Sequence, residues 1–226
     1  MTTVIIDFDK RVKEIKLYFK LLEKVIEHDA SLFLPNNQTH KYMRFDDDLQ
    51  KVMKANMFLL LYNLAESSIK QALTEIYDVI TSENVKYGDV KDEIKKIWIS
   101  TNYNNFNNMG VDNIFSALNQ IAEDIIEIEF DSSKKISGNI DGRKIRNFAA
   151  TIGFSTRAHH SLDNGTKLHI VKTQRNKLAH GDLSFAECGR NYTITDLKSI
   201  NNQVTKYLKR VLLNIEKYLT EKSYLI

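Results

Sequence analysis

Hydrophobic residues recur at intervals of three and four along most of this chain, the spacing that gathers them on one face of an α-helix. The strongest such segment is 46–80, which no Gly or Pro interrupts. Its apolar positions are Met53, Met57, Leu60, Leu61, Leu64, Ile69, Leu73, Ile76 and Ile80. Three aspartates open the segment, and carboxylates are favourable at the positive end of a helix dipole. At about 1.5 Å per residue, this helix is long enough to span a whole domain.

The same periodicity predicts six further helices, and polar segments separate them. The helices are expected over 8–28, 89–100, 112–127, 141–152, 161–179 and 195–219. Loops are expected over 29–45, 101–110 and 182–191, and a small hairpin over 126–130 and 135–136. Asp141 is a plausible N-cap, and Gly153 and Gly181 stand where a helix stops in a left-handed residue.

The chain is predicted to be all-α. Four long helices (8–28, 46–80, 161–179 and 195–219) would form an antiparallel four-helix bundle. Residues 83–160 would be a mostly helical insertion between the second and third of them. A length of 226 residues suits one domain over 1–226, and a single proline with eight glycines favours long helices.

Composition narrows the class of protein. The single cysteine, Cys188, excludes an internal disulfide and a thiolate cluster, which favours a reducing, cytoplasmic setting. The first residues lack the apolar core of a signal peptide. The longest apolar run, 57–62, is too short to cross a membrane, so no membrane partner is expected.

Charge is unevenly distributed along the chain. Residues 132–180 hold ten Lys and Arg against two acidic residues, a net charge of +8. Because the whole chain carries +3, the remainder carries −5. A basic segment in an otherwise acidic protein suggests a polyanionic partner, although a solvated basic face would give the same count.

The basic segment ends in K-T-Q-R-N-K-L-A-H-G (172–181), which holds Arg175 and His180. An arginine grips phosphate oxygens with a permanent planar charge, and a histidine gives or takes a proton near neutral pH. Together they would cleave RNA without a metal, since the ribose 2′-hydroxyl attacks the phosphorus while His180 moves a proton. Arg175 would stabilise the charge on the phosphoryl oxygens.

The spacing of the pair does not by itself require this chemistry. Five positions on a helix separate two side chains by about 140°, and they converge only if the helix tightens or ends between them. In the alternative interpretation, Arg175 pairs with an acidic residue and His180 stabilises the helix C-terminus.

The segment R-N-K-L-A-H-G (175–181), on the third long helix, resembles the signature of the HEPN superfamily, in which an Arg is followed by a polar residue, a short spacer and a His. Three longer stretches resemble the MAE-type HEPN proteins of bacterial conflict and phage-defence loci. They are F-L-L-L-Y-N-L-A-E-S-S-I (58–69), S-G-N-I-D-G-R-K-I-R (137–146) and R-N-K-L-A-H-G-D-L-S-F-A-E-C-G-R (175–190). In this order they cover most of the chain.

This resemblance implies a metal-independent endoribonuclease with no cofactor, acting as a toxin or abortive-infection effector on an RNA substrate. It implies a homodimer in which two Arg–His motifs share one cleft, and it raises an antitoxin or another defence protein as a possible partner. Some HEPN proteins are silenced at a Tyr two positions after the His, but that position is Asp182 here. Others have lost catalysis and bind a partner protein or nucleotide, which is the alternative function.

Further residues are candidates for supporting roles. Asn176 would hold the phosphate or orient His180, or else cap the helix end. Glu66 would pair with Arg175, or else be a surface residue, and Asn63 carries the same ambiguity one turn earlier. The cations expected to bind RNA are Arg143, Lys144, Arg146, Lys172 and Lys177, although those at 143–146 also suit a capped surface helix.

The remaining candidates are weaker. Tyr42, Tyr103 and Phe106 would stack on unpaired bases, or more simply pack on the domain. His159, His160 and His169 lack the spacing of metal ligands, so no metal site is predicted. Cys188 has no neighbouring His and is not expected to be a nucleophile.

Overall fold

The computed structural model describes residues 1–35, 41–107, 110, 113, 128 and 139–226, and gives no side-chain account of 101–107. Its α-helices are α1 (Thr2–Glu27), α2 (Asp47–Ser82), α3 (Asp92–Asn107), α6 (Gly142–Ile152), α7 (Thr166–His180), α8 (Phe185–Arg190) and α9 (Ile194–Thr220). Short 3₁₀ turns lie at Tyr87–Asp89 and His160–Gly165, and β1 (Ser31–Leu34) pairs with β2 (Lys41–Arg44). The all-α prediction is confirmed.

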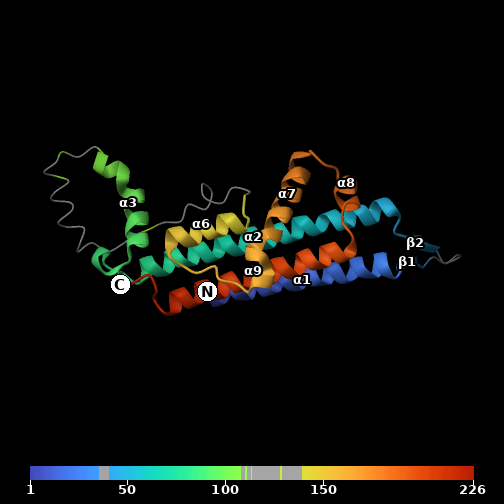
Figure 1. The fold of residues 1–226 in the computed structure, drawn as a ribbon. Coiled ribbons are helices and arrows are strands. Elements are labelled where there is room, and N and C mark those ends of the chain that lie inside the picture. The colour runs from blue at the N-terminus through green and yellow to red at the C-terminus, as the bar shows by residue number, and fades with distance from the viewer. Residues whose placement is uncertain (36–40, 108–109, 111–112, 114–127, 129–138) are drawn as a thin grey trace.

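The three longest helices, α1, α2 and α9, run side by side along the body of the molecule (Figure 1). Helix α1 is antiparallel to both of the others, because its start lies beside residue 71 of α2 and residue 209 of α9. Its end lies beside the start of α9, where Lys198 pairs with Glu23. The apolar positions that face inward, such as Leu22, Leu64 and Leu208, are at most 1% exposed. Burial of these side chains is the main favourable term in folding.

Helix α2 is the centre of the fold, since it packs against α1, α7, α8 and α9. This position explains why its buried residues lie on more than one face. In the view of Figure 1, α6 runs nearly parallel to α2, whereas α7 stands across α2. The fourth helix of the expected bundle therefore meets α2 at a crossing, and only part of α7 faces the core.

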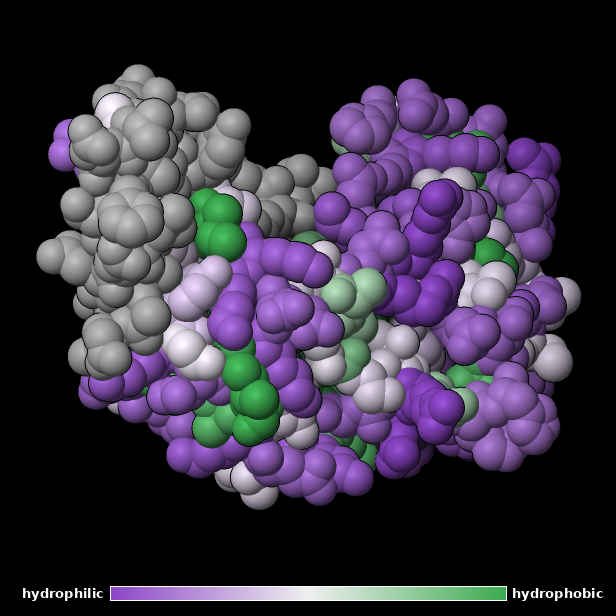
Figure 2. Space-filling view, turned by 60° about the vertical axis from the view of Figure 1, so that its left-hand side comes forward, coloured by the Kyte–Doolittle hydropathy of each residue, from purple (hydrophilic) through white to green (hydrophobic). Residues whose placement is uncertain are grey.

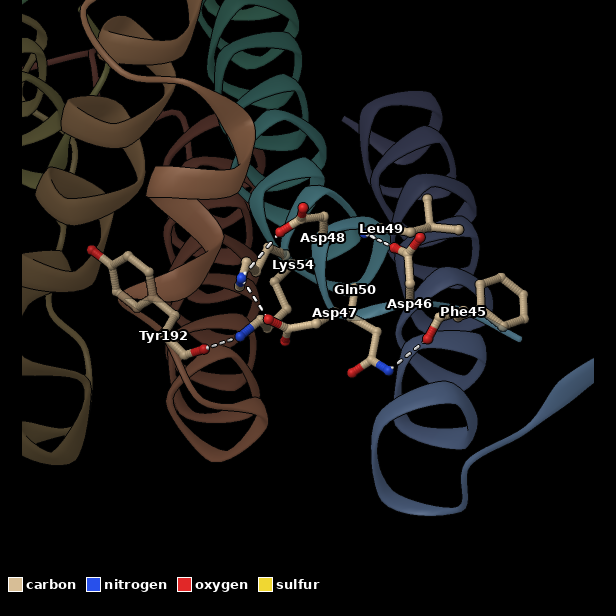
Figure 3. Close-up of polar contacts among 9 residues, drawn as sticks. Phe45, Asp46, Asp47, Asp48, Leu49, Gln50, Lys54 and Tyr192 are labelled. Atoms are coloured by element: carbon tan, nitrogen blue, oxygen red, sulfur yellow. Dashed lines mark hydrogen bonds and ion pairs between the residues drawn. The ribbon is translucent and has the colours of Figure 1, made fainter. Parts of the chain in front are cut away.

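Asp46, Asp47 and Asp48 lie at the N-terminus of α2 (Figure 3). The Asp46 carboxylate accepts a hydrogen bond from the Leu49 backbone N–H at 2.8 Å, which satisfies an otherwise unpaired helix donor. Lys54, further along the helix, donates to the Tyr192 backbone carbonyl at 2.9 Å. This bond joins the start of α2 to the segment that leads into α9.

Several element boundaries differ from the predictions. Helix α1 begins at Thr2 instead of residue 8, because Val4 and Phe8 already pack into the core. Leu17, on its expected apolar stripe, is 62% exposed. The predicted loop 29–45 contains the hairpin, and the asparagine-rich segment continues α3 through Asn107. The helix expected over 112–127 and the hairpin at 126–136 lie outside the described residues, apart from single positions.

Two further differences concern α7 and the segment that follows it. The helix expected to begin at 161 begins at Thr166, because Asp163, Asn164 and Gly165 all have left-handed backbone angles that no α-helix accommodates. The predicted loop 182–191 contains α8, whose start carries a capping box between Ser184 and Glu187. The Ser-x-x-Glu pattern at 184–187 signals this helix in the sequence.

The face of the molecule in Figure 2 is mostly hydrophilic, and hydrophobic residues appear on it in small separate areas. In the part of the chain that the structure describes, no helix combines the length and the apolar character needed to cross a membrane.

Candidate functional site

Helix α7 carries the Arg–His motif and ends as the sequence indicates. Gly181 has φ 76°, and its N–H bonds to the Lys177 carbonyl, as does the Asp182 N–H at 2.9 Å. A left-handed residue here favours glycine, which has no Cβ to clash with the backbone. His180 is therefore the last residue in helical conformation.

Arg175 faces α2 and is 18% exposed at its side chain. Its guanidinium carbon lies 3.5 Å from the centre of the Tyr62 ring, and Nη2 lies 3.6 Å from Glu66 Oε2. The cation is thus stacked on an aromatic face and attracted by a carboxylate, each contact contributing on the order of 1 kcal/mol. The hypothesis that Glu66 orients Arg175 matches this geometry.

Tyr62 is the site residue that the sequence analysis missed. It lies four positions before Glu66 and so on the same face of α2, which is the signal that would have found it. Its ring is 1% exposed, and its hydroxyl accepts a hydrogen bond from the Ile140 backbone N–H at 3.2 Å. Burial raises the pKa of Tyr62, so the residue stays neutral. Tyr62 connects Arg175 to the segment that enters α6.

His180 is exposed, whereas Arg175 is partly buried. It is exposed in the last turn of α7, where a cation would be favoured by the negative end of the helix dipole. Because α7 is α-helical from Thr166 through His180, the helix does not end between the two residues as the sequence analysis considered. On one chain they point about 140° apart, Arg175 toward α2 and His180 toward solvent.

The two asparagine candidates differ in burial. Asn63 is exposed on α2. Asn176, next to Arg175, has a buried side-chain oxygen that accepts no hydrogen bond from the described residues. Asn176 does not cap the end of α7, since Gly181 and Asp182 bond to the Lys177 carbonyl there.

The five candidate RNA-binding cations fall into two groups. Arg143, Arg146 and Lys177 are exposed. Lys144 has its ammonium 5.1 Å from the centre of the Phe148 ring, and Lys172 is ion-paired with Asp141. Lys172 and Lys144 thus make contacts within the fold, and so does the exposed Arg146, which donates to the Asn164 carbonyl.

Asp141 is the N-cap of α6, as predicted, and joins this helix to α7. One carboxylate oxygen accepts from the Lys144 backbone N–H at 2.9 Å, and the other pairs with Lys172 and lies 3.6 Å from His169 Nδ1. Burial alone would raise the pKa of Asp141, but the hydrogen bonds from Lys172 and Lys144 outweigh it and lower the pKa. Asp141 is therefore ionised at neutral pH.

The weaker candidates are also placed. Cys188 is fully buried in α8 instead of a loop, and burial raises the pKa of its thiol to about 11, so the reactive thiolate is suppressed. Tyr42 lies on β2 with its ring 5.4 Å from that of Phe33, while the side chains of Tyr103 and Phe106 lie outside the described residues. Among described residues, no three His, Cys, Asp or Glu side chains are grouped as metal ligands would be.

Comparison with known protein families shows which family the chain belongs to. The model of one protein family, the HEPN_MAE_28990-like HEPN domains, matches residues 1–224. The chain belongs to this HEPN family. Searches of curated proteins and of solved structures found no match. Because the match runs from α1 through α9, the Arg175–His180 pair on α7 lies within the matched HEPN region.

Proposed function

We propose that this HEPN protein is a metal-independent RNA endonuclease, acting as a toxin or abortive-infection effector in phage defence. The observation that carries the proposal is the position of Arg175, Asn176 and His180 on the last turns of α7 within a HEPN domain. These residues supply a permanent cation, an amide and an imidazole that can take or give a proton.

The chemistry follows from these groups. The ribose 2′-hydroxyl attacks the adjacent phosphorus as a histidine takes its proton, and the bond to the 5′-oxygen breaks as that oxygen receives a proton. The products are a 2′,3′-cyclic phosphate and a 5′-hydroxyl. Arg175, held by Tyr62 and Glu66, stabilises the negative charge on the phosphoryl oxygens during the attack.

The orientation of α7 favours a site built by two copies of the chain. One chain presents Arg175 and His180 on different sides of the helix, so a phosphate held by Arg175 lies away from the His180 of the same chain. A symmetric dimer that brings two α7 ends together supplies two histidines, one to accept a proton and one to donate it. Dimerisation is therefore part of the proposed mechanism.

The test is RNA cleavage by purified protein in EDTA. Wild type is expected to cut and His180→Ala to lose activity. His28→Ala is the matched control, because His28 is also an exposed histidine at a helix C-terminus. A requirement for divalent metal, or cleavage by His180→Ala at the wild-type rate, would refute the mechanism.

A second candidate function is a non-catalytic module that binds a partner protein or nucleotide. The contacts of Arg175 with Tyr62 and Glu66 favour it, because they give the arginine a structural role that requires no substrate. This function predicts no cleavage, and growth arrest on expression in bacteria that is absent or unaffected by His180→Ala. Arrest that His180→Ala relieves would support the nuclease instead.

A further inference from the structure

A cleft of about 300 Å³ opens where the start of α6 meets the start of α7. It is lined by Asp141 to Arg143 and Arg146 from one side, and by Asn164 to Thr166, His169 and Lys172 from the other. The cleft does not include Arg175, His180 or Asn176. It is thus a feature separate from the motif at the end of α7.

The lining of the cleft is cationic. Arg143, Arg146 and Lys172 each carry a positive charge, Asp141 carries a negative one, and His169 adds an imidazole. Asp141 is neutralised locally, because it is ion-paired with Lys172 and caps α6. Arg143 and Arg146 remain exposed at the opening, and His169 is 66% exposed. An excess of positive charge in a concave site favours an anion.

The Arg146 side chain is held by the turn that precedes α7. Its Nη1 donates to the Asn164 backbone carbonyl at 2.6 Å. Burial raises the pKa of the Tyr207 hydroxyl, while Arg146 beside it lowers that pKa. Among the described residues the Tyr207 hydroxyl makes no hydrogen bond of ordinary geometry, so Arg146 acts on it through its charge. The guanidinium is positioned before any ligand arrives, which reduces the entropy lost on binding.

The turn at 163–165, which forms one wall of the cleft, has an unusual backbone conformation. Asp163, Asn164 and Gly165 have φ values of 43°, 48° and 78°, a conformation that costs on the order of 1 kcal/mol at a non-glycine residue. The turn brings the carbonyls of Asn164 and Gly165 against Gly142, where an added Cβ would lie 2.6 Å from the nearer oxygen. Only glycine at 142 permits this approach of the turn to the start of α6.

We propose that this cleft binds the phosphate of a nucleotide, with Arg143 and Arg146 as its principal ligands and His169 as a third. The chemistry is that of a phosphate ester anion, which two arginines recognise through paired hydrogen bonds. The phosphate comes either from an RNA strand or from a free nucleotide. If it comes from RNA, the inference rests on the proposed function and makes the cleft a substrate subsite.

The position of the cleft suits either source. Lys172 lines the cleft, and Arg175 follows three residues later, about 4.5 Å along the axis of α7. A strand whose phosphate occupies the cleft would therefore pass close to Arg175. A free nucleotide in the cleft would instead act on the joint between α6 and α7 through Asp141 and Lys172.

The experiment measures binding, not cleavage, in a His180→Ala background. A labelled single-stranded RNA oligonucleotide and adenosine monophosphate are titrated separately against Arg143→Gln/Arg146→Gln and against a control, Arg157→Gln/Arg190→Gln. The control removes two exposed arginines outside the cleft. We expect binding of at least one probe to weaken about tenfold or more in the cleft variant, and less than threefold in the control.

The two probes distinguish the sources. Loss of RNA binding alone assigns the phosphate to a strand, and loss of monophosphate binding assigns it to a free nucleotide. Equal weakening by both double variants, or no weakening by the cleft variant, overturns the proposal. If circular dichroism shows that the double variant is unfolded, Arg143→Gln alone decides, because Arg143 is exposed. Since no cleavage is measured, a failed nuclease test leaves this result unaffected.

Discussion

The middle of α7 and its last turn are held by different kinds of interaction. The middle turns are fixed by tertiary contacts, through Lys172 with Asp141 and Arg175 with Tyr62 and Glu66. Its last turn is fixed by local helix chemistry, with Gly181 closing the helix and His180 exposed. One motif thus holds two kinds of residue. The fold positions Arg175 through tertiary contacts, and it leaves His180 exposed to a partner or substrate.

The largest expected effect separates activity from stability at these two parts of α7. In the proposed mechanism His180 transfers a proton and Arg175 stabilises the phosphoryl charge, so His180→Ala and Arg175→Ala should each lower RNA cleavage by about 10²-fold or more. Only Arg175→Ala should also lower the free energy of unfolding, by about 1–3 kcal/mol, because it leaves Glu66 and Tyr62 without their cation. Cleavage assays and urea denaturation check this pair. Equal stability loss in both variants would contradict the comparison.

The two glycines that flank α7 test the same contrast in the backbone. Both have positive φ, but an added Cβ at Gly165 would lie 2.5 Å from the Tyr207 ring, whereas at Gly181 nothing lies within 4 Å. Gly165→Ala should therefore destabilise by about 3 kcal/mol, from strain and overpacking together. Gly181→Ala should cost about 1 kcal/mol from strain alone. Thermal unfolding of the two variants measures the difference, and a larger loss at Gly181 would show that the end of α7 is packed after all.

The Asp141 contacts predict a pH dependence of stability. The folded state lowers the pKa of Asp141, so this residue stabilises the protein above its unfolded pKa of about 3.9 and loses that contribution as pH falls further. Asp141→Asn keeps a capping side chain but loses the charge that faces Lys172. Wild type should exceed the variant in unfolding free energy by about 1 kcal/mol at pH 7, and the gap should close below about pH 4. A gap that widens on acidification would show the opposite linkage.

The smallest effect is expected beneath the cleft. Tyr207→Phe removes a buried hydroxyl that has no hydrogen bond of ordinary geometry among the described residues, so stability should change by less than about 1 kcal/mol. Phosphate-ligand binding should weaken slightly, because Arg146 loses its polar neighbour. Calorimetry and probe titration check the two parts. A loss of several kcal/mol would reveal a hydrogen bond to the hydroxyl that stabilises the fold.

Much of the fold was predictable from residues whose role is local. The periodic apolar positions of α2 and α9, the caps Asp46 and Asp141, and the stops Gly153 and Gly181 all act within a few residues of their position. The elements that were missed are short. The hairpin strands span four residues each, and α8 spans six, too few for a helical period to be recognised. Only the Ser184–Glu187 capping box signalled α8.

The sequence by itself determined the helical class, the HEPN resemblance and the pair Arg175 and His180, because these depend on residue type and spacing along the chain. Tertiary structure alone decided that Arg175 turns inward onto Tyr62 while His180 stays at the surface. It also decided that α7 crosses α2 and meets α6 at a basic cleft. The physical reason is that burial and charge pairing depend on which distant segments pack together. The spacing of residues along one helix does not specify which segments those are.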